Sequence, residues 1–158
     1  MKKRMVAGML CMMMAVCMAV PASAAEEKST TLITDVASEY TLTIPMNMEI
    51  TFGAEETGIG SVKVTGNVKP AETVKVDVET GNFISQDDPQ DTIVLTLINK
   101  NDNSEFGISI WNEKEMRDET KKIPLAVQIK SEDWGKAHAG TYQATLTFTA
   151  SLSTPPAP

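Results

Sequence analysis

The sequence predicts an all-β protein, a single antiparallel β-sandwich of the Ig-like or Greek-key type with about eight or nine strands. Short runs in which apolar and polar residues alternate fill most of the chain after residue 29. Turn residues separate these runs at intervals of roughly 8 to 12 residues, as in a sandwich. Helix signals are nearly absent, so the chain offers no crossover helices to connect parallel strands.

The first 24 residues are expected to form a secretory signal peptide. Lys2, Lys3 and Arg4 give a basic start, an apolar run follows over 5–20, and Ala22-Ser23-Ala24 has the small residues of a cleavage site. The alternative is a membrane anchor, but a spanning helix needs roughly 20 apolar residues. Cleavage after Ala24 would leave a β-sandwich domain over 25–152 and a disordered, proline-rich tail over 153–158. This mature chain would not span a membrane.

The mature chain is expected to be acidic and free of cysteine. All 21 acidic residues lie after residue 24, while Lys2, Lys3 and Arg4 are removed from the 14 basic residues. Cys11 and Cys17 would also leave with the signal peptide, so no disulfide is expected. Excess negative charge repels nucleic acid, so a nucleic-acid partner is excluded. The composition suits an exported protein, either secreted or associated with the cell wall.

The predicted strands follow one another closely along the chain. Residues 91–99 are the most continuously apolar and are expected to form a central strand. Residues 112–122 are charged and are expected to form a loop, with at most one helical turn, and 131–140 another short turn. The strands are expected over 30–36, 40–45, 48–53, 60–67, 72–82, 91–99, 105–112, 122–130 and 140–152.

The last strand carries the clearest alternation. Tyr142, Leu146 and Phe148 are expected to face the core, together with Ala144 and Ala150. Thr147 stands on the opposite face.

Two tryptophans are the candidate ligand or partner contacts. Trp111 falls out of phase with Phe106, Ile108 and Ile110, which are expected to face inward, so it either caps the sandwich edge or stands exposed. Trp134 lies in the loop before the last strand, where it either closes the end of the core or contacts a ligand.

No catalytic, cofactor or metal site is expected. A Ser-His-Asp triad would have to use His138, because it is the one histidine, and no Gly-x-Ser-x-Gly or His-Glu-x-x-His motif is present. The oxygen-rich stretches 99–105 and 85–91 are interpreted as turns rather than calcium sites, since Asn and Asp favour turns and the spacing is not that of an EF-hand.

The end of the chain resembles a family of small exported surface proteins. Trp134 followed by Gly140-Thr141-Tyr142 and a long threonine-rich strand is similar to the C-terminal pattern of WxL-type cell-wall proteins of Gram-positive bacteria. The stretch 42–53, ending in Phe52-Gly53, resembles their early strand, and Phe148 stands in place of a tryptophan. The resemblance implies a β-sandwich fold and a cell-wall polymer or another surface protein as partner.

Three functions follow from these observations. The first is a non-catalytic surface or extracellular module for binding or structure. The second is a self-assembling subunit of pilus-like or biofilm fibres, because the strand-like stretches 30–36 and 141–152 lie near the two ends of the chain and open edges pair readily. The third is a small secreted hydrolase.

Overall fold

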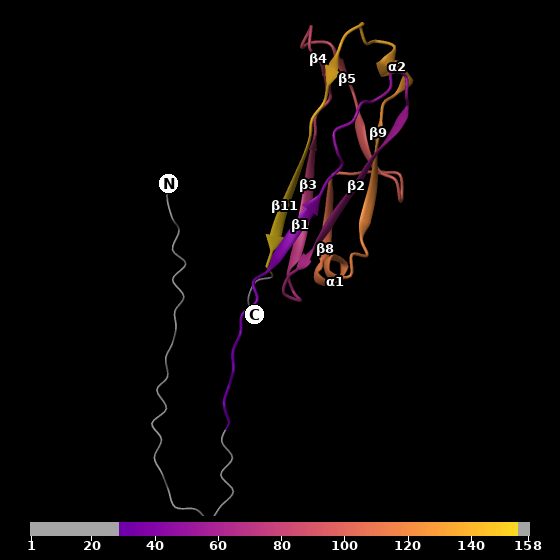
Figure 1. Ribbon diagram of the computed structural model, residues 1–158. Coiled ribbons are helices and arrows are strands. Elements are labelled where there is room, and N and C mark those ends of the chain that lie inside the picture. The colour runs from indigo at the N-terminus through magenta and orange to yellow at the C-terminus, as the bar shows by residue number, and fades with distance from the viewer. Residues whose placement is uncertain (1–28, 155–158) are drawn as a thin grey trace, which may run out of the picture. The chain divides into compact units, whose positions relative to one another are not determined.

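The computed structural model describes residues 29–154 (Figure 1). The chain divides into two units, Met1–Thr34 and Asp35–Pro158. In the first unit, the described residues 29–34 are exposed and have no regular secondary structure. The predicted signal peptide, 1–24, lies outside the described residues, as does most of the predicted tail. Between residues 29 and 154, no helix is long and apolar enough to cross a membrane.

The second unit carries two layers of antiparallel strands. The larger sheet has the order β1-β2-β9-β6-β7. Its strands are β1 (Glu39–Thr43), β2 (Glu56–Asn67), β9 (Lys122–Gln128), β6 (Thr96–Asn99) and β7 (Ser104–Glu105). Each neighbouring pair is antiparallel. The all-β antiparallel prediction is therefore confirmed.

The second layer contains two short sheets placed end to end along the chain. One has the order β11-β3-β8 and the other β10-β4-β5. Their strands are β11 (Leu146–Ser153), β3 (Thr73–Thr80), β8 (Ile108–Asn112), β10 (Tyr142–Gln143), β4 (Phe83–Ser85) and β5 (Thr92–Ile93). The described residues thus form eleven strands rather than eight or nine, because single predicted runs split at bends.

The core lies between the two layers. One buried cluster fills the space between the layers. It contains alternate residues of β2 and β9 from the larger sheet and of β3 from the second layer, as the period-two pattern predicts. Its members include Val62, Val64, Leu125, Val74, Val76 and Trp111. Figure 1 shows β1 and β11 running beside each other along one side of the unit, where the Tyr40 hydroxyl donates to the Ala150 carbonyl at 3.3 Å.

Five predicted strands differ from the structure. Residues 30–36 and 48–53 form no strand. Three predicted runs each divide into two strands of different sheets: 91–99 into β5 and β6, 105–112 into β7 and β8, and 140–152 into β10 and β11. Pro45 explains the absence of a strand over 48–53, because it lacks the N–H that would continue the ladder of β1. The charged stretch after β8 forms the short helix α1 (Glu113–Arg117), in which Asn112 and Glu115 cap each other's backbone N–H groups.

The prediction of which β8 side chains face the core is wrong. Phe106 is buried, but Ile108 and Ile110 are half exposed, while Trp111 is fully buried. The chain passes from β7 in one layer to β8 in the other through Phe106 and Gly107, so the alternation restarts at Ile108. Two adjoining apolar runs therefore merge into one apparent pattern in the sequence.

Candidate functional site: an apolar groove beside the last strand

An apolar groove opens between the segment 44–52 and the strands β10 and β11. Two adjoining cavities, of 510 and 1010 Å³, share Asn47, Met48, Ile50 and Phe83 in their walls. The smaller cavity reaches Leu146 and Phe148, and the larger reaches Trp134 and His138. We refer to this pair of cavities as the groove.

Local sequence explains why the groove exists. β1 pairs with residues 63–67 of β2 and ends at Thr43, two residues before Pro45. Pro45 then packs over Gly60, and the chain turns at Gly53, which has a φ of +78°. Segment 44–52 consequently runs past the remaining half of β2 without pairing to it. On that half, β2 pairs with β9 alone.

The segment presents apolar side chains to solvent. Met46 is 87 % exposed, Met48 50 % and Phe52 75 %. Methionine is unbranched and flexible, and it adapts to partners of irregular shape. A cluster of exposed apolar side chains beside a groove is typical of a binding surface.

Trp134 forms one end of the groove. It closes the short helix α2 (Ser131–Trp134), and its indole N–H donates to the Ala54 carbonyl at 3.0 Å. The Phe52 ring meets the indole edge-on, with centroids 5.3 Å apart. Trp134 is half-buried and lines the groove.

Trp111 occupies a different environment. Its side chain is fully buried, its indole N–H donates to the Lys121 carbonyl at 3.3 Å, and the Lys121 ammonium lies 4.9 Å from the ring centroid. The interpretation of Trp111 as an exposed ligand contact is therefore wrong. The shifted phase of β8 turns this side chain into the core.

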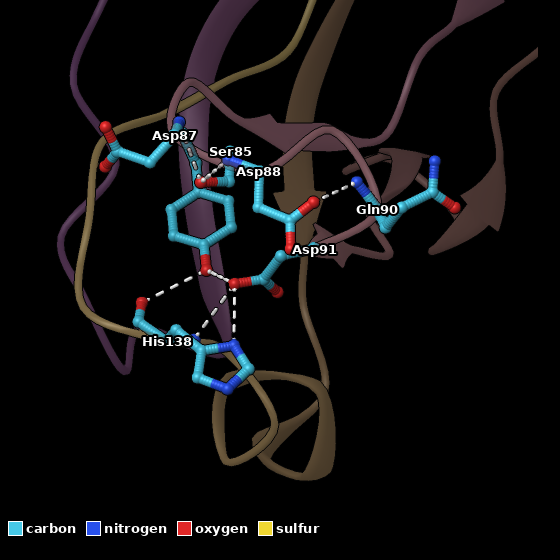
Figure 2. A network of polar contacts seen from close by, with 7 residues as sticks. Ser85, Asp87, Asp88, Gln90, Asp91 and His138 are labelled. Carbon is cyan, nitrogen blue, oxygen red and sulfur yellow. Dashed lines mark hydrogen bonds and ion pairs between the residues drawn. The ribbon is translucent and has the colours of Figure 1, made fainter.

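A polar cluster lies beside the aromatic end of the groove (Figure 2). The Asp91 carboxylate accepts hydrogen bonds from the Tyr142 hydroxyl and from the backbone N–H of His138, the latter at 3.2 Å. The His138 Nδ1 atom is 3.0 Å from the same carboxylate oxygen. The Tyr142 hydroxyl also lies 3.0 Å from the His138 carbonyl. One carboxylate thus ties the loop before β10 to the loop before β5.

These contacts shift two pKa values. The hydrogen bond from Tyr142, followed by that from His138, holds the pKa of the Asp91 carboxyl below its ordinary value. The same Asp91 carboxylate raises the pKa of the Tyr142 hydroxyl. Asp91 therefore acts as an ionised acceptor that fixes the wall of the groove.

The cluster contains an Asp–His pair. Asp91 is placed to orient the His138 ring, as the acid of a Ser-His-Asp triad does. Among the hydrogen bonds of the described residues, however, none joins a serine or threonine hydroxyl to that ring. The His138 side chain itself is 86 % exposed.

The oxygen-rich stretches form turns. The stretch 99–105 closes the β6–β7 hairpin, with Asn103 at a φ of +57° and Asp102 accepting from the Ser104 N–H at 3.0 Å. In the stretch 85–91, Ser85 accepts from the N–H groups of Asp87 and Asp88. Within residues 29–154, no group of three metal-ligating side chains is arranged to hold an ion.

Comparison with known proteins adds no assignment. No protein-family model matches the chain, and the curated proteins contain no match to it.

The groove was not predicted from the sequence, although the apolar residues of segment 42–53 and the position of Trp134 both point to this region.

Proposed function

We propose that the protein is a secreted, non-catalytic extracellular module that binds an extended partner chain in the groove. The observation that carries the proposal is the groove itself, where half-exposed apolar side chains border an edge strand. Export is supported by the basic start, the apolar run and Ala22-Ser23-Ala24. The resemblance to WxL-type proteins supports a cell-surface location, with a cell-wall polymer or another surface protein as partner.

The chemistry of the groove favours a polypeptide over a wall polymer. The walls are mainly apolar, whereas polymers of the bacterial wall are polar and commonly anionic. The excess of acidic residues in the chain opposes an anionic partner. An extended peptide, by contrast, gains main-chain hydrogen bonds at a strand edge and buries alternate side chains beside it.

Calorimetric titration tests the proposal. The probe is a synthetic peptide of alternating valine and threonine residues, with purified peptidoglycan as the second ligand, added to protein beginning at Ala25. We expect the peptide to bind and Met48→Asp to weaken binding about tenfold or more, about 1.4 kcal/mol. Ile110→Asp is the matched control, because Ile110 is 52 % exposed but lies on β8, away from the groove.

Two results would overturn this function. One is that the unaltered protein gives no heat of binding with the peptide and none with peptidoglycan. The other is equal weakening by Met48→Asp and Ile110→Asp while both variants keep their thermal melting transitions. If the Met48→Asp variant binds peptidoglycan as tightly as the unaltered protein does, the wall polymer binds at a surface other than the groove.

A second candidate, a small secreted hydrolase, is favoured by the Asp91–His138 pair. It requires turnover of an ester or glycoside that disappears in His138→Ala. Nitrophenyl esters and glycosides provide the assay, and Ile110→Asp serves as the control, because Ile110 lies on β8 and lines neither cavity. Under our proposal no such turnover is observed.

A further inference from the structure

The segment Thr30–Val36 has the sequence of a strand but no strand partner. Its residues are Thr-Thr-Leu-Ile-Thr-Asp-Val, rich in the β-branched types that favour strands. In the structure it belongs to no ladder, and Leu32 and Ile33 are each 91 % exposed, with Val36 64 % exposed. We refer to it as the donor segment.

The edge of β11 is open on the side of the groove. β11 pairs with β3 alone and therefore ends its sheet. The Ala150 carbonyl points away from β3, since it accepts from the Tyr40 hydroxyl. Because backbone polar groups alternate in direction along a strand, those of Leu146 and Phe148 also point away from β3, toward the groove that these residues line.

We propose that the donor segment of one copy adds as a strand to the β10–β11 edge of a second copy and fills its groove. This inference rests on the proposed function, since it names the extended chain that the groove binds. An added strand would pair with the free backbone groups of Leu146 and Phe148. It would also cover apolar side chains that are now exposed.

The dimensions agree. The edge that lines the smaller cavity runs over Gln143–Phe148 and is about 20 Å long at the usual rise of a strand. The seven residues of the donor segment span about 23 Å when extended. In that conformation Leu32 and Val36 lie on one face and enter the groove, while Ile33 lies on the outer face.

The charges are also compatible. Asp35 is the one charged residue of the donor segment, and it shares the outer face with Ile33. The residues that Asp35 would face are polar and uncharged, namely Thr145, directly before β11, and Thr147 and Thr149 of β11. The net negative charge of the two copies opposes their association in general, but no charged side chain of β11 itself faces Asp35.

A second copy is the better donor for a geometric reason. Only Ala37 and Ser38 separate Val36 from β1, and Ser38 donates to Glu72, directly before the start of β3. That is the end of the unit where β11 finishes, because Ser153 pairs with Thr73. A segment folding back in its own copy would first meet β1, whereas the groove lies farther along, beside Gln143–Phe148.

The other open edges fit less well. β7 offers only Ser104 and Glu105, β5 offers only Thr92 and Ile93, and β1 is occupied beside Tyr40 by β11. β8 is longer, but neither cavity of the groove is lined by it. The choice of β10–β11 therefore follows from the position of the groove.

Disulfide trapping tests the proposal directly. The chain beginning at Ala25 has no cysteine, so single cysteines report single positions. One preparation carries Ile33→Cys, and a second carries Thr145→Cys, Thr147→Cys or Thr149→Cys, which samples the register of pairing. After mixing and mild oxidation, we expect covalent heterodimers in at least one combination, about tenfold above Ile33→Cys mixed with Ile110→Cys.

Three results would overturn it. The first is no excess of heterodimer over the Ile110→Cys control. The second is preferential trapping of Ile110→Cys, which would place the segment on β8. The third is obtained with both cysteines in one chain: an internally linked monomer without any linked dimer would mean that the segment folds onto its own copy.

Sedimentation velocity gives an independent measure. Leu32→Asp should weaken self-association about tenfold or more, while Ile33→Asp, on the outer face, should change it much less. Equal effects would contradict the predicted orientation. If the valine–threonine peptide binds but no heterodimer forms, the groove keeps its proposed function and only the identity of the partner fails. If neither occurs, both proposals fail.

Discussion

One side of the molecule is closed at one end and open at the other. At the closed end β1 pairs with β2, and Tyr40 reaches across to β11. At the open end the chain has left the ladder at Pro45, and a groove separates segment 44–52 from the same β11. The two ends differ by one missing strand partner. A few residues without ladder bonds are therefore enough to leave apolar side chains exposed beside a groove.

The largest difference between the two environments should appear at the tryptophans. Trp111→Ala removes a fully buried side chain and should lower the free energy of unfolding by about 3–5 kcal/mol. Trp134→Ala removes a half-buried ring at the groove and should cost clearly less. Urea melts of both variants make the comparison, and equal losses would mean that the groove is as tightly packed as the core.

The closed end depends on a glycine. A Cβ on Gly66 would lie 2.3 Å from the Glu39 carbonyl oxygen, so Gly66→Ala must push β1 away. We expect a loss of about 1–3 kcal/mol, as for other overpacked sites. Gly58→Ala on the same strand is the control, because a Cβ there meets nothing within 4 Å. Chemical denaturation of the two variants checks this, and similar stabilities would show that β1 is loosely held.

Phe148→Ala tests how much less a side chain beside the groove contributes to stability than a fully buried one. Its side chain is only half-buried, so Phe148→Ala should cost roughly 1–2 kcal/mol, below the loss typical of a fully buried ring. Thr147→Ala, on the exposed face of the same strand, should cost under about 0.5 kcal/mol. Thermal melts at low and high protein concentration measure both. A concentration-dependent loss at Thr147 would indicate that a partner covers that face.

The smallest effect concerns acid. Because the folded-state pKa of Asp91 is lowered, its ionised form stabilises the fold above the ordinary value of 3.8, and this contribution is lost as the pH falls through the lowered value. Asp91→Asn should therefore melt below the unaltered protein near neutrality, and the gap should narrow in acid. Melting temperatures across the pH range provide the test. A gap that widens in acid would contradict the role of Asp91 as an ionised acceptor.

Much of the fold could be predicted from alternation alone. In β11, Leu146 and Phe148 face the core and Thr147 faces solvent, as the period-two pattern requires. The pattern failed at β8, because Phe106 and Ile108 belong to different layers although they are two residues apart. Alternation cannot reveal a change of layer when both runs are apolar.

The groove could not be predicted from the sequence for a related reason. The stretch 48–53 alternates like a strand, yet Pro45 removes it from the ladder and leaves Met48 and Phe52 beside a cavity. Whether an alternating run finds a partner depends on residues far away in the chain. The hydrogen bonds that His138 and Tyr142 donate to Asp91 likewise join positions about 50 residues apart, which no local pattern reports.

Glu72 has a topological consequence. Its buried carboxylate accepts from the Ser38 hydroxyl, directly before β1, and Glu72 adjoins Thr73, which pairs with Ser153 at the end of β11. Ser38 and Ser153, at the two ends of the folded unit, therefore lie beside the adjacent residues Glu72 and Thr73. A short linker from Thr154 to Ser38 would make the backbone a closed ring, which could be cut at an exposed loop such as 86–90 without separating any pair of neighbouring strands. Circular permutants of this kind should fold, because the architecture depends on which strands meet and not on which is made first.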